Sequence, residues 1–278
     1  MDFVTGEIIC VDKPLGWTSF DVVKRLRGAL QRRLGVKKFK VGHAGTLDPL
    51  ATGVLIICTG KATSLIERLQ EGKKEYIANV RFGATTPSFD LEKDIDATYP
   101  YQHITRQLIL DTLPKFTGKI LQVPPVFSAV KVDGKRAYLE ARKGKEVELK
   151  AKPLEITEFE LLDFDGRDAT LRIVCSKGTY IRALARDLGI ALESGAHLIG
   201  LRRTSVGDMT VDNALSVNEA IDLIDSTPLT FPDNYPGADS ALPPTPAGEY
   251  LRKIATGELP AEKSPKKNIT AFRSNTDA

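Results

Sequence analysis

Residues 42–53, with the sequence GHAGTLDPLATG, are the most constrained segment of this 278-residue chain. Three glycines and a proline within twelve residues predict a loop whose backbone path is tightly fixed. Pro49 disfavours a helical conformation for Asp48, so we expect the Asp48 carboxylate to lie on extended backbone just before a buried strand at 53–58. Such a loop suits a carboxylate presented into a cleft, whereas an isolated Asp-Pro turn more often leaves its side chain in solvent.

Residues 176–182 (SKGTYIR) contain a possible partner for Asp48. Gly178 and Thr179 are typical of the entry to a helix, which places Arg182 in its first turn and Arg186 one turn later on the same face. An arginine in a cleft needs a carboxylate or a phosphate to meet it. Paired with Asp48, Arg182 would keep that carboxylate ionised and orient it as a nucleophile. The alternative is a surface arginine.

Two tyrosines lie beside basic residues, Tyr76 after a pair of lysines and Tyr180 shortly after Lys177. An aromatic face next to positive charge is the surface on which an unstacked nucleobase packs. The alternative for either tyrosine is a half-buried position at a sheet edge.

Positive charge is concentrated in two stretches of a chain whose net charge is only +3. Residues 22–40 hold eight basic side chains and no acidic one, and residues 131–152 hold eight basic against four acidic ones. Such blocks are typical of a surface that contacts nucleic-acid phosphates, and the alternative is a solvated helix face.

Composition excludes several classes of protein. Hydrophobic residues make up 42% and charged residues 27%, which is ordinary for a globular chain. The longest apolar run, at 54–58, is far too short to cross a membrane, and the first residues do not resemble a signal peptide. The three cysteines are widely spaced, which argues against a disulfide framework or a thiolate metal site. We therefore expect a cytoplasmic location.

The predicted elements mix strands and helices without a regular β-α-β order, which favours an α+β fold around a mixed sheet. Strands are expected at 7–12, 53–58 and 76–82, with a hairpin of 153–164 and 169–175. Helices are expected after capping boxes at 18–21 and 216–219, and at 62–70, 105–113 and 180–193. Eight of the sixteen prolines lie beyond residue 225. We predict a catalytic body at 1–225 and a weakly structured, Pro-rich segment at 226–278 with one short helix at 249–255.

Six motifs occur in the order found in one enzyme family. They are residues 12–19 (DKPLGWTS), 42–53, 74–76 (KEY), 122–131 (QVPPVFSAVK), 175–182 (CSKGTYIR) and 196–204 (AHLIGLRRT). They resemble the bacterial tRNA pseudouridine synthase B (TruB) family, which isomerises uridine-55 in the T loop of tRNA, and the resemblance covers about residues 7–209. The resemblance implies a pseudouridine-synthase fold, with a largely antiparallel mixed sheet flanked by helices.

The resemblance also implies roles for individual residues. Asp48 matches the nucleophilic aspartate and Arg182 the arginine that pairs with it, while Tyr76 matches the tyrosine that stacks on the target uracil, with a possible part in proton transfer. Three further positions match residues that bind the RNA: His43, which reorganises the T loop, and Tyr180 and Leu201, which line the uridine pocket. Lys13 lies in a motif interpreted as support for the active-site loop.

The chain departs from the family pattern at two places. Residues 85–92 keep Asp90 but lack the glycine that usually follows the acidic residue. The C-terminal segment lacks the alternating strands of the RNA-binding PUA domain found in many members, so we expect a truncated or degenerate version at most.

The implied reaction breaks the bond from ribose C1′ to uracil N1 and rejoins the base through C5. It needs no redox change or energy input, so we expect no metal and no cofactor. The expected partner is the T stem-loop of tRNA, with no membrane, no required protein partner and a monomeric enzyme. The alternatives are a non-catalytic tRNA-binding or folding chaperone that uses the same surface and, more distantly, an aspartate-dependent hydrolase of small nucleotides.

Overall fold

The computed structural model describes residues 1–125, 131–132, 135–136 and 149–229. Nine strands within these ranges form one sheet with the order β1-β3-β12-β4-β11-β10-β7, to which β2 and β13 are joined at β3 and β12. Among the described strands only β3 and β12 pair in parallel, so the sheet is mixed and largely antiparallel, as predicted. The strands of this sheet are β1 (Ile8–Lys13), β2 (Val41–Ala44), β3 (Ala51–Thr59), β4 (Lys74–Phe82), β7 (Gly118–Gln122), β10 (Lys152–Phe164), β11 (Asp168–Cys175), β12 (Ala196–Val206) and β13 (Met209–Thr210).

The described ranges also contain two short strand pairs and several helices. The pairs are β5 (Ala84–Thr85) with β6 (Ala97–Thr98), and β8 (Lys131–Val132) with β9 (Lys135–Arg136). The helices are α1 (Ser19–Leu34), η1 (Gly60–Leu65), α2 (Ile66–Leu69), α3 (Arg106–Thr112), η2 (Leu113–Phe116), α5 (Ile181–Ala191), η3 (Val211–Asn213) and α6 (Val217–Ser226). No helix of the described ranges is long and apolar enough to cross a membrane.

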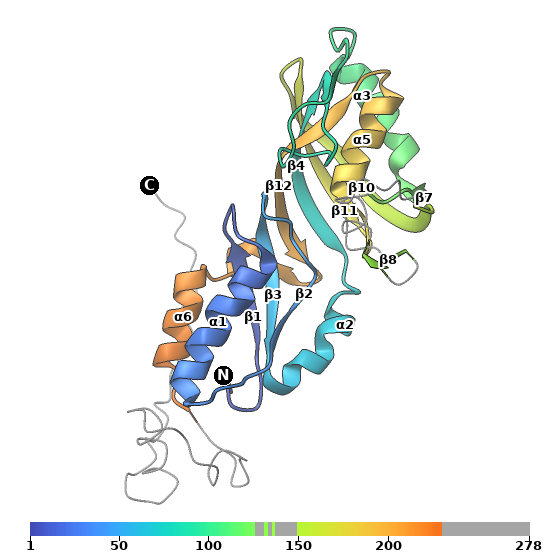
Figure 1. Cartoon of the computed structure of the whole chain (residues 1–278). Coiled ribbons are helices and arrows are strands. Elements are labelled where there is room, and N and C mark those ends of the chain that lie inside the picture. The colour runs from blue at the N-terminus through green and yellow to red at the C-terminus, as the bar shows by residue number, and fades with distance from the viewer. Residues whose placement is uncertain (126–130, 133–134, 137–148, 230–278) are drawn as a thin grey trace, which may run out of the picture.

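Both predicted capping boxes begin helices. The Thr18 hydroxyl accepts a hydrogen bond from the Asp21 amide at 3.0 Å, and the Asp21 carboxylate accepts one from the Thr18 amide at 2.9 Å. Ser216 and Glu219 form the same reciprocal pair at the start of α6. Each box satisfies amide donors that a helix leaves unpaired at its N-terminus. Figure 1 shows α1 and α6 packed side by side at one end of the sheet.

Strand β3 is buried on both faces, which explains its continuous apolar sequence. Leu55 and Ile57 pack with α1 and α6, whereas Val54, Ile56 and Cys58 pack toward η1 and α2. The strand that follows the Asp48 loop is therefore fixed from two sides.

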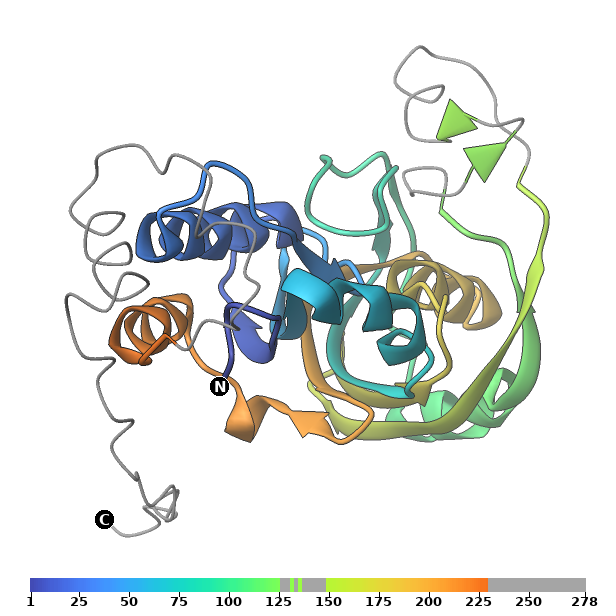
Figure 2. The same ribbon diagram turned by 90° about the horizontal axis from the view of Figure 1, so that it is seen from below.

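The larger core lies at the other end of the sheet. Alternate residues of β4, from Tyr76 to Phe82, face this core together with apolar residues of β10, β11, α3 and α5. Figure 2 shows the sheet curved around α5. This curvature places α5 in contact with β12 and β4.

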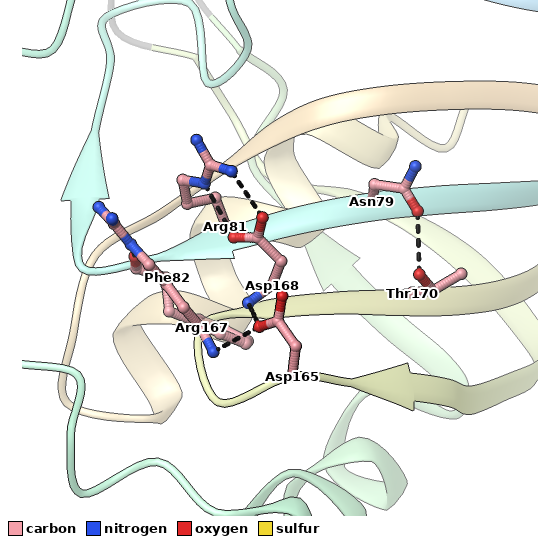
Figure 3. A network of polar contacts seen from close by, with 7 residues as sticks. All are labelled: Asn79, Arg81, Phe82, Asp165, Arg167, Asp168 and Thr170. Atoms are coloured by element: carbon pink, nitrogen blue, oxygen red, sulfur yellow. Dashed lines mark hydrogen bonds and ion pairs between the residues drawn. The ribbon is translucent and has the colours of Figure 1, made fainter.

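Polar contacts fix the predicted hairpin of β10 and β11 (Figure 3). The Asp165 carboxylate accepts hydrogen bonds from the amides of Arg167 and Asp168 at 2.9 and 2.7 Å. Asp168 in turn accepts two hydrogen bonds from the Arg81 guanidinium of β4, at 2.8 and 2.6 Å. The turn therefore sets the register of the hairpin against β4.

Several predictions differ from the structure, among them the loop at 42–53, whose two ends belong to β2 and β3. Residues 62–70 were expected to form one helix, but η1 is a 3₁₀-helix, because the hydroxyls of Thr63 and Ser64 bond the carbonyls three residues earlier. Helix α5 ends at Ala191, with Glu193 in the left-handed region, before the expected stop at Gly195. Strand β12 was not predicted as a strand. The predicted helix at 249–255, most of the 131–152 basic stretch and all of the C-terminal segment after residue 229 lie outside the described residues.

Candidate active site

Hydrogen bonds fix the backbone on both sides of Asp48. The Ser19 hydroxyl, at the start of α1, donates to the Leu47 carbonyl at 2.9 Å and accepts from the Leu47 amide at 2.8 Å. On the other side, the Pro49 carbonyl accepts from the Gly16 amide at 2.9 Å. Asp48 itself lies in the loop between β2 and β3, as expected from the proline that follows it. The carboxylate is thus presented from an anchored loop.

The side chain of Lys13 also supports the Asp48 loop. Its side chain is fully buried, and its ammonium donates to the carbonyls of Pro14, Trp17 and Pro49 at 2.9, 2.5 and 3.4 Å. Burial lowers the pKa of Lys13 to about 8, an effect that the nearby Asp48 charge partly opposes. The three donors of the charged form match three carbonyls, which agrees with the role expected for Lys13.

The position of Lys13 predicts a pH effect on turnover. Lys13 is protonated below pH 8 and loses a donor above it, so we expect the single-turnover rate at saturating RNA to fall severalfold between about pH 7 and 9. In Lys13→Met the rate should be lower throughout and should show no step near pH 8. Circular dichroism at each pH controls for unfolding. An identical alkaline step in Lys13→Met would assign the step to another group.

Arg182 contacts the Asp48 carboxylate. It is the second residue of α5, and its Nη2 lies 3.0 Å from Asp48 Oδ2. The Arg182 side chain is 8% exposed, whereas that of Asp48 is 44% exposed, so a buried cation orients an accessible carboxylate. The pairing inferred from sequence is present in the structure, and Arg182 lies in the first turn of the helix as predicted, although the N-cap is Tyr180 and not the Gly178–Thr179 pair.

A second carboxylate also contacts the Arg182 guanidinium. Asp90 Oδ2 lies 3.6 Å from Arg182 Nε, and the Ser88 carbonyl accepts from Arg182 Nη1 at 3.1 Å. Phe89, between them, has φ near +60°, a conformation that non-glycine residues rarely adopt. The Phe89 carbonyl accepts from the Leu198 amide of β12 at 2.9 Å, which stabilises this turn.

Tyr76 is buried in β4 and lies next to the buried guanidinium of Arg203. Burial raises the pKa of Tyr76, and the positive charge of Arg203 opposes that rise. Arg203, on β12, also donates to the carbonyls of Val54 and Gly45 at 2.8 and 3.0 Å. The Arg203 guanidinium therefore joins both ends of the Asp48 loop next to Tyr76, an arrangement that sequence reasoning did not identify.

Most of the predicted site residues meet at one cavity of about 490 Å³. Its lining includes Asp48, Tyr76, Tyr180, Arg182 and Leu201. The backbone of Tyr180 is fixed by the buried Gln122, whose amide side chain accepts from the Tyr180 N–H at 2.9 Å and donates to its carbonyl at 3.2 Å. A carboxylate, a guanidinium and two tyrosines thus surround a space large enough for a nucleoside.

His43, the remaining predicted site residue, is not among the residues that line this cavity. It lies on β2, and its Nδ1 is buried without a hydrogen-bond partner among the described residues. Burial, followed by the charge of Arg203, lowers the pKa of His43, which favours the neutral imidazole.

Comparison with known proteins places the chain among the pseudouridylate synthases. Residues 31–181 match the TruB family pseudouridylate synthase N-terminal domain, and residues 182–227 match the tRNA pseudouridylate synthase B C-terminal domain. A tRNA pseudouridine synthase B of Phocaeicola vulgatus is 64% identical over 225 residues, which cover 81% of this chain and 96% of the relative. The chain belongs to the TruB family, as the six motifs predicted, and is an isomerase of uridine in RNA.

More distant relatives agree with this assignment. A tRNA pseudouridine synthase B of Flavobacterium johnsoniae is 50% identical over 217 residues, 78% of this chain and 95% of the relative. Among solved structures, a Cbf5–Nop10–Gar1 complex contains a similar chain, with a TM-score of 0.59 and 30% identity over 79% of this chain. The present chain spans only 55% of that protein's length.

Proposed function

We propose that the enzyme acts on tRNA and isomerises uridine-55 of the T loop, with Asp48 as the nucleophile. The observation that carries the proposal is the 3.0 Å ion pair between a buried Arg182 and an accessible Asp48 at the wall of a nucleoside-sized cavity. The names of the close relatives support tRNA as the substrate.

The proposed reaction begins when the target uridine leaves its stack and enters the cavity. The face of Tyr76 supports the uracil, and Tyr180 and Leu201 line the same space. Asp48 can then attack C1′ or C6, or remove the C2′ proton to form a glycal, and each route needs an ionised carboxylate beside the sugar–base bond. Arg182 keeps that carboxylate in place. His43 lies outside the cavity lining, and we propose that it contacts the T loop after the target uridine has left its stack.

Tritium release tests this proposal. A tRNA transcript labelled at uracil C5 loses tritium when the base is rejoined through C5, whereas a chaperone binds the same transcript without releasing any. Hydrolysis of free uridine nucleotides, with no release from tRNA, would instead support the nucleotide hydrolase.

Replacement of Tyr76 by Phe separates stacking from proton transfer. Phenylalanine keeps the aromatic face, which contributes about 1–3 kcal/mol per stacked base, but loses the hydroxyl that the charge of Arg203 influences. We expect tRNA affinity within a few-fold of the wild type and a slow or stalled chemical step in single-turnover assays. Weak binding with normal chemistry would show that the hydroxyl serves binding instead.

We also propose that one chain suffices for activity and that it works in the cytoplasm. The tRNA substrate and the free cysteines, Cys10, Cys58 and Cys175, support this location. Activity of the purified chain that stays proportional to its concentration, together with a monomeric mass in solution, would agree with this proposal.

A further inference from the structure

Part of the basic block at residues 22–40 holds the fold together. The Arg27 guanidinium donates to the Val41 carbonyl at 2.9 Å, and that of Arg33 donates to the Thr227 carbonyl at 3.2 Å. These contacts fix α1 to β2 and to the segment after α6. Arg27 and Arg33 are therefore occupied within the protein and are poor candidates for contacts with a ligand.

The exposed cations of α1 instead line a groove. The side chains of Lys24, Arg25 and Arg32 are exposed and form no hydrogen bond or ion pair with other residues that the structure describes. They share one side of the helix, and the groove beside them has a volume of about 480 Å³. The complete lining is Gly16, Trp17, Asp21, Lys24, Arg25, Gly28 and Arg32.

Gly28 lies in the middle of this groove. Glycine within a helix costs roughly 0.5–1 kcal/mol relative to alanine. A Cβ at this position would meet only the Arg32 guanidinium, at 3.6 Å, so no close packing requires glycine here. The single acidic member of the lining, Asp21, is engaged in the capping box with Thr18. The groove is thus positively charged and unobstructed.

The groove begins next to the active site. The Gly16 amide at its end donates to the Pro49 carbonyl, directly after Asp48. The preceding residue, Leu15, lines a hollow of about 130 Å³ together with Asp48 and Arg182. A strand whose base reaches Asp48 can therefore continue over Leu15 and Gly16 into the groove.

We propose that the α1 groove binds the phosphodiester backbone of the RNA strand that flanks the target uridine. Lys24 and Arg32 are eight residues apart, or about 12 Å along the helix axis. That distance is comparable with a few nucleotides of one strand. The three cations, which form no ion pair within the described part of the chain, can therefore contact several successive phosphates. This inference rests on the proposed function, because RNA is the ligand.

A triple substitution, Lys24→Gln/Arg25→Gln/Arg32→Gln, tests the groove. The matched control is Arg106→Gln/Lys115→Gln/Lys119→Gln, which removes the same charge from exposed positions at the other end of the molecule. Filter binding of tRNA at several salt concentrations gives affinity and salt dependence for each protein. We expect the groove variant to bind about tenfold or more weakly at fixed salt, with a salt slope flatter by about two to three. The control variant should change the slope little.

Tritium release, measured separately from binding, distinguishes failure of this inference from failure of the proposed function. At saturating enzyme, the groove variant should release tritium from tRNA at the wild-type rate, because the groove does not touch the uracil. Binding is measured independently of chemistry, so absence of tritium release in all proteins would contradict the proposed function without deciding on the groove. Equal loss of affinity and slope in both triple variants would overturn the groove, since only overall charge would then matter.

Two substitutions at Gly28 test the groove independently of its basic residues. Gly28→Ala should leave tRNA affinity unchanged, whereas Gly28→Glu should weaken it severalfold by placing a carboxylate among the three cations. Both substitutions improve helix propensity, so loss of folding does not explain a difference. Equal affinities of the two variants would contradict the proposal.

Discussion

Replacement of Asp48 by Asn is expected to abolish pseudouridine formation while tRNA binding stays within a few-fold of the wild type. The amide lacks the charge needed to act as a nucleophile, and the charge removed is one that repels phosphate. The backbone contacts of Leu47 and Pro49 do not involve the carboxylate, so the loop should keep its shape. Tritium release and filter binding, measured on the same preparations, check both parts.

The Asp48→Asn protein also distinguishes the catalytic function from the alternative of a tRNA-folding chaperone. A chaperone uses the basic surface and the cavity but not the carboxylate, so its effect on tRNA folding would be unchanged by the substitution. Turnover by Asp48→Asn near the wild-type rate would contradict the assignment of Asp48 as the nucleophile.

Replacement of Arg182 by Lys should be nearly as severe. The guanidinium contacts Asp48, Asp90 and the Ser88 carbonyl at once, and a lysine ammonium cannot reproduce this planar arrangement. Because lysine keeps the charge but loses this geometry, we expect the rate to fall by roughly a hundredfold, which corresponds to about 3 kcal/mol of transition-state stabilisation. Single-turnover rates at saturating enzyme measure this loss.

Arg186→Lys is the matched control for that experiment. Arg186 lies one turn later on α5 and contacts the Val123 carbonyl, Asp187 and the ring of Phe89, but not Asp48. The same chemical change there should lower the rate only slightly, and thermal unfolding of both variants shows whether stability is affected. Nearly full activity of Arg182→Lys would reduce Arg182 to a phosphate contact.

The parts of the site that depend on local sequence could be predicted. The proline after Asp48 determines its backbone, and the Gly-Thr pair before α5 places Arg182 in the first turn. The two capping boxes likewise set the starts of α1 and α6. Each of these features involves residues only a few positions apart, so the sequence pattern contains the whole interaction.

The parts that depend on distant contacts could not be predicted. Asp90 reaches Arg182 only because the loop turns at Phe89 in the left-handed region, which no residue of that stretch signals. Strand β12 contains Gly200 and two arginines, and its place between β3 and β4 comes from pairing across more than a hundred residues. Arg203 likewise links Tyr76 to the Asp48 loop through tertiary contacts alone. The resemblance to the family drew attention to these stretches but not to their contacts.

The stoichiometry of tritium release tests the central claim most directly. Enzyme in excess is mixed with a tRNA transcript that carries tritium at C5 of every uracil, and with a matched transcript in which uridine-55 is replaced by cytidine. The account predicts the release of one tritium per molecule from the first transcript and none from the second. Equal release from both transcripts, or no release from either, would contradict the claim that this enzyme isomerises uridine-55.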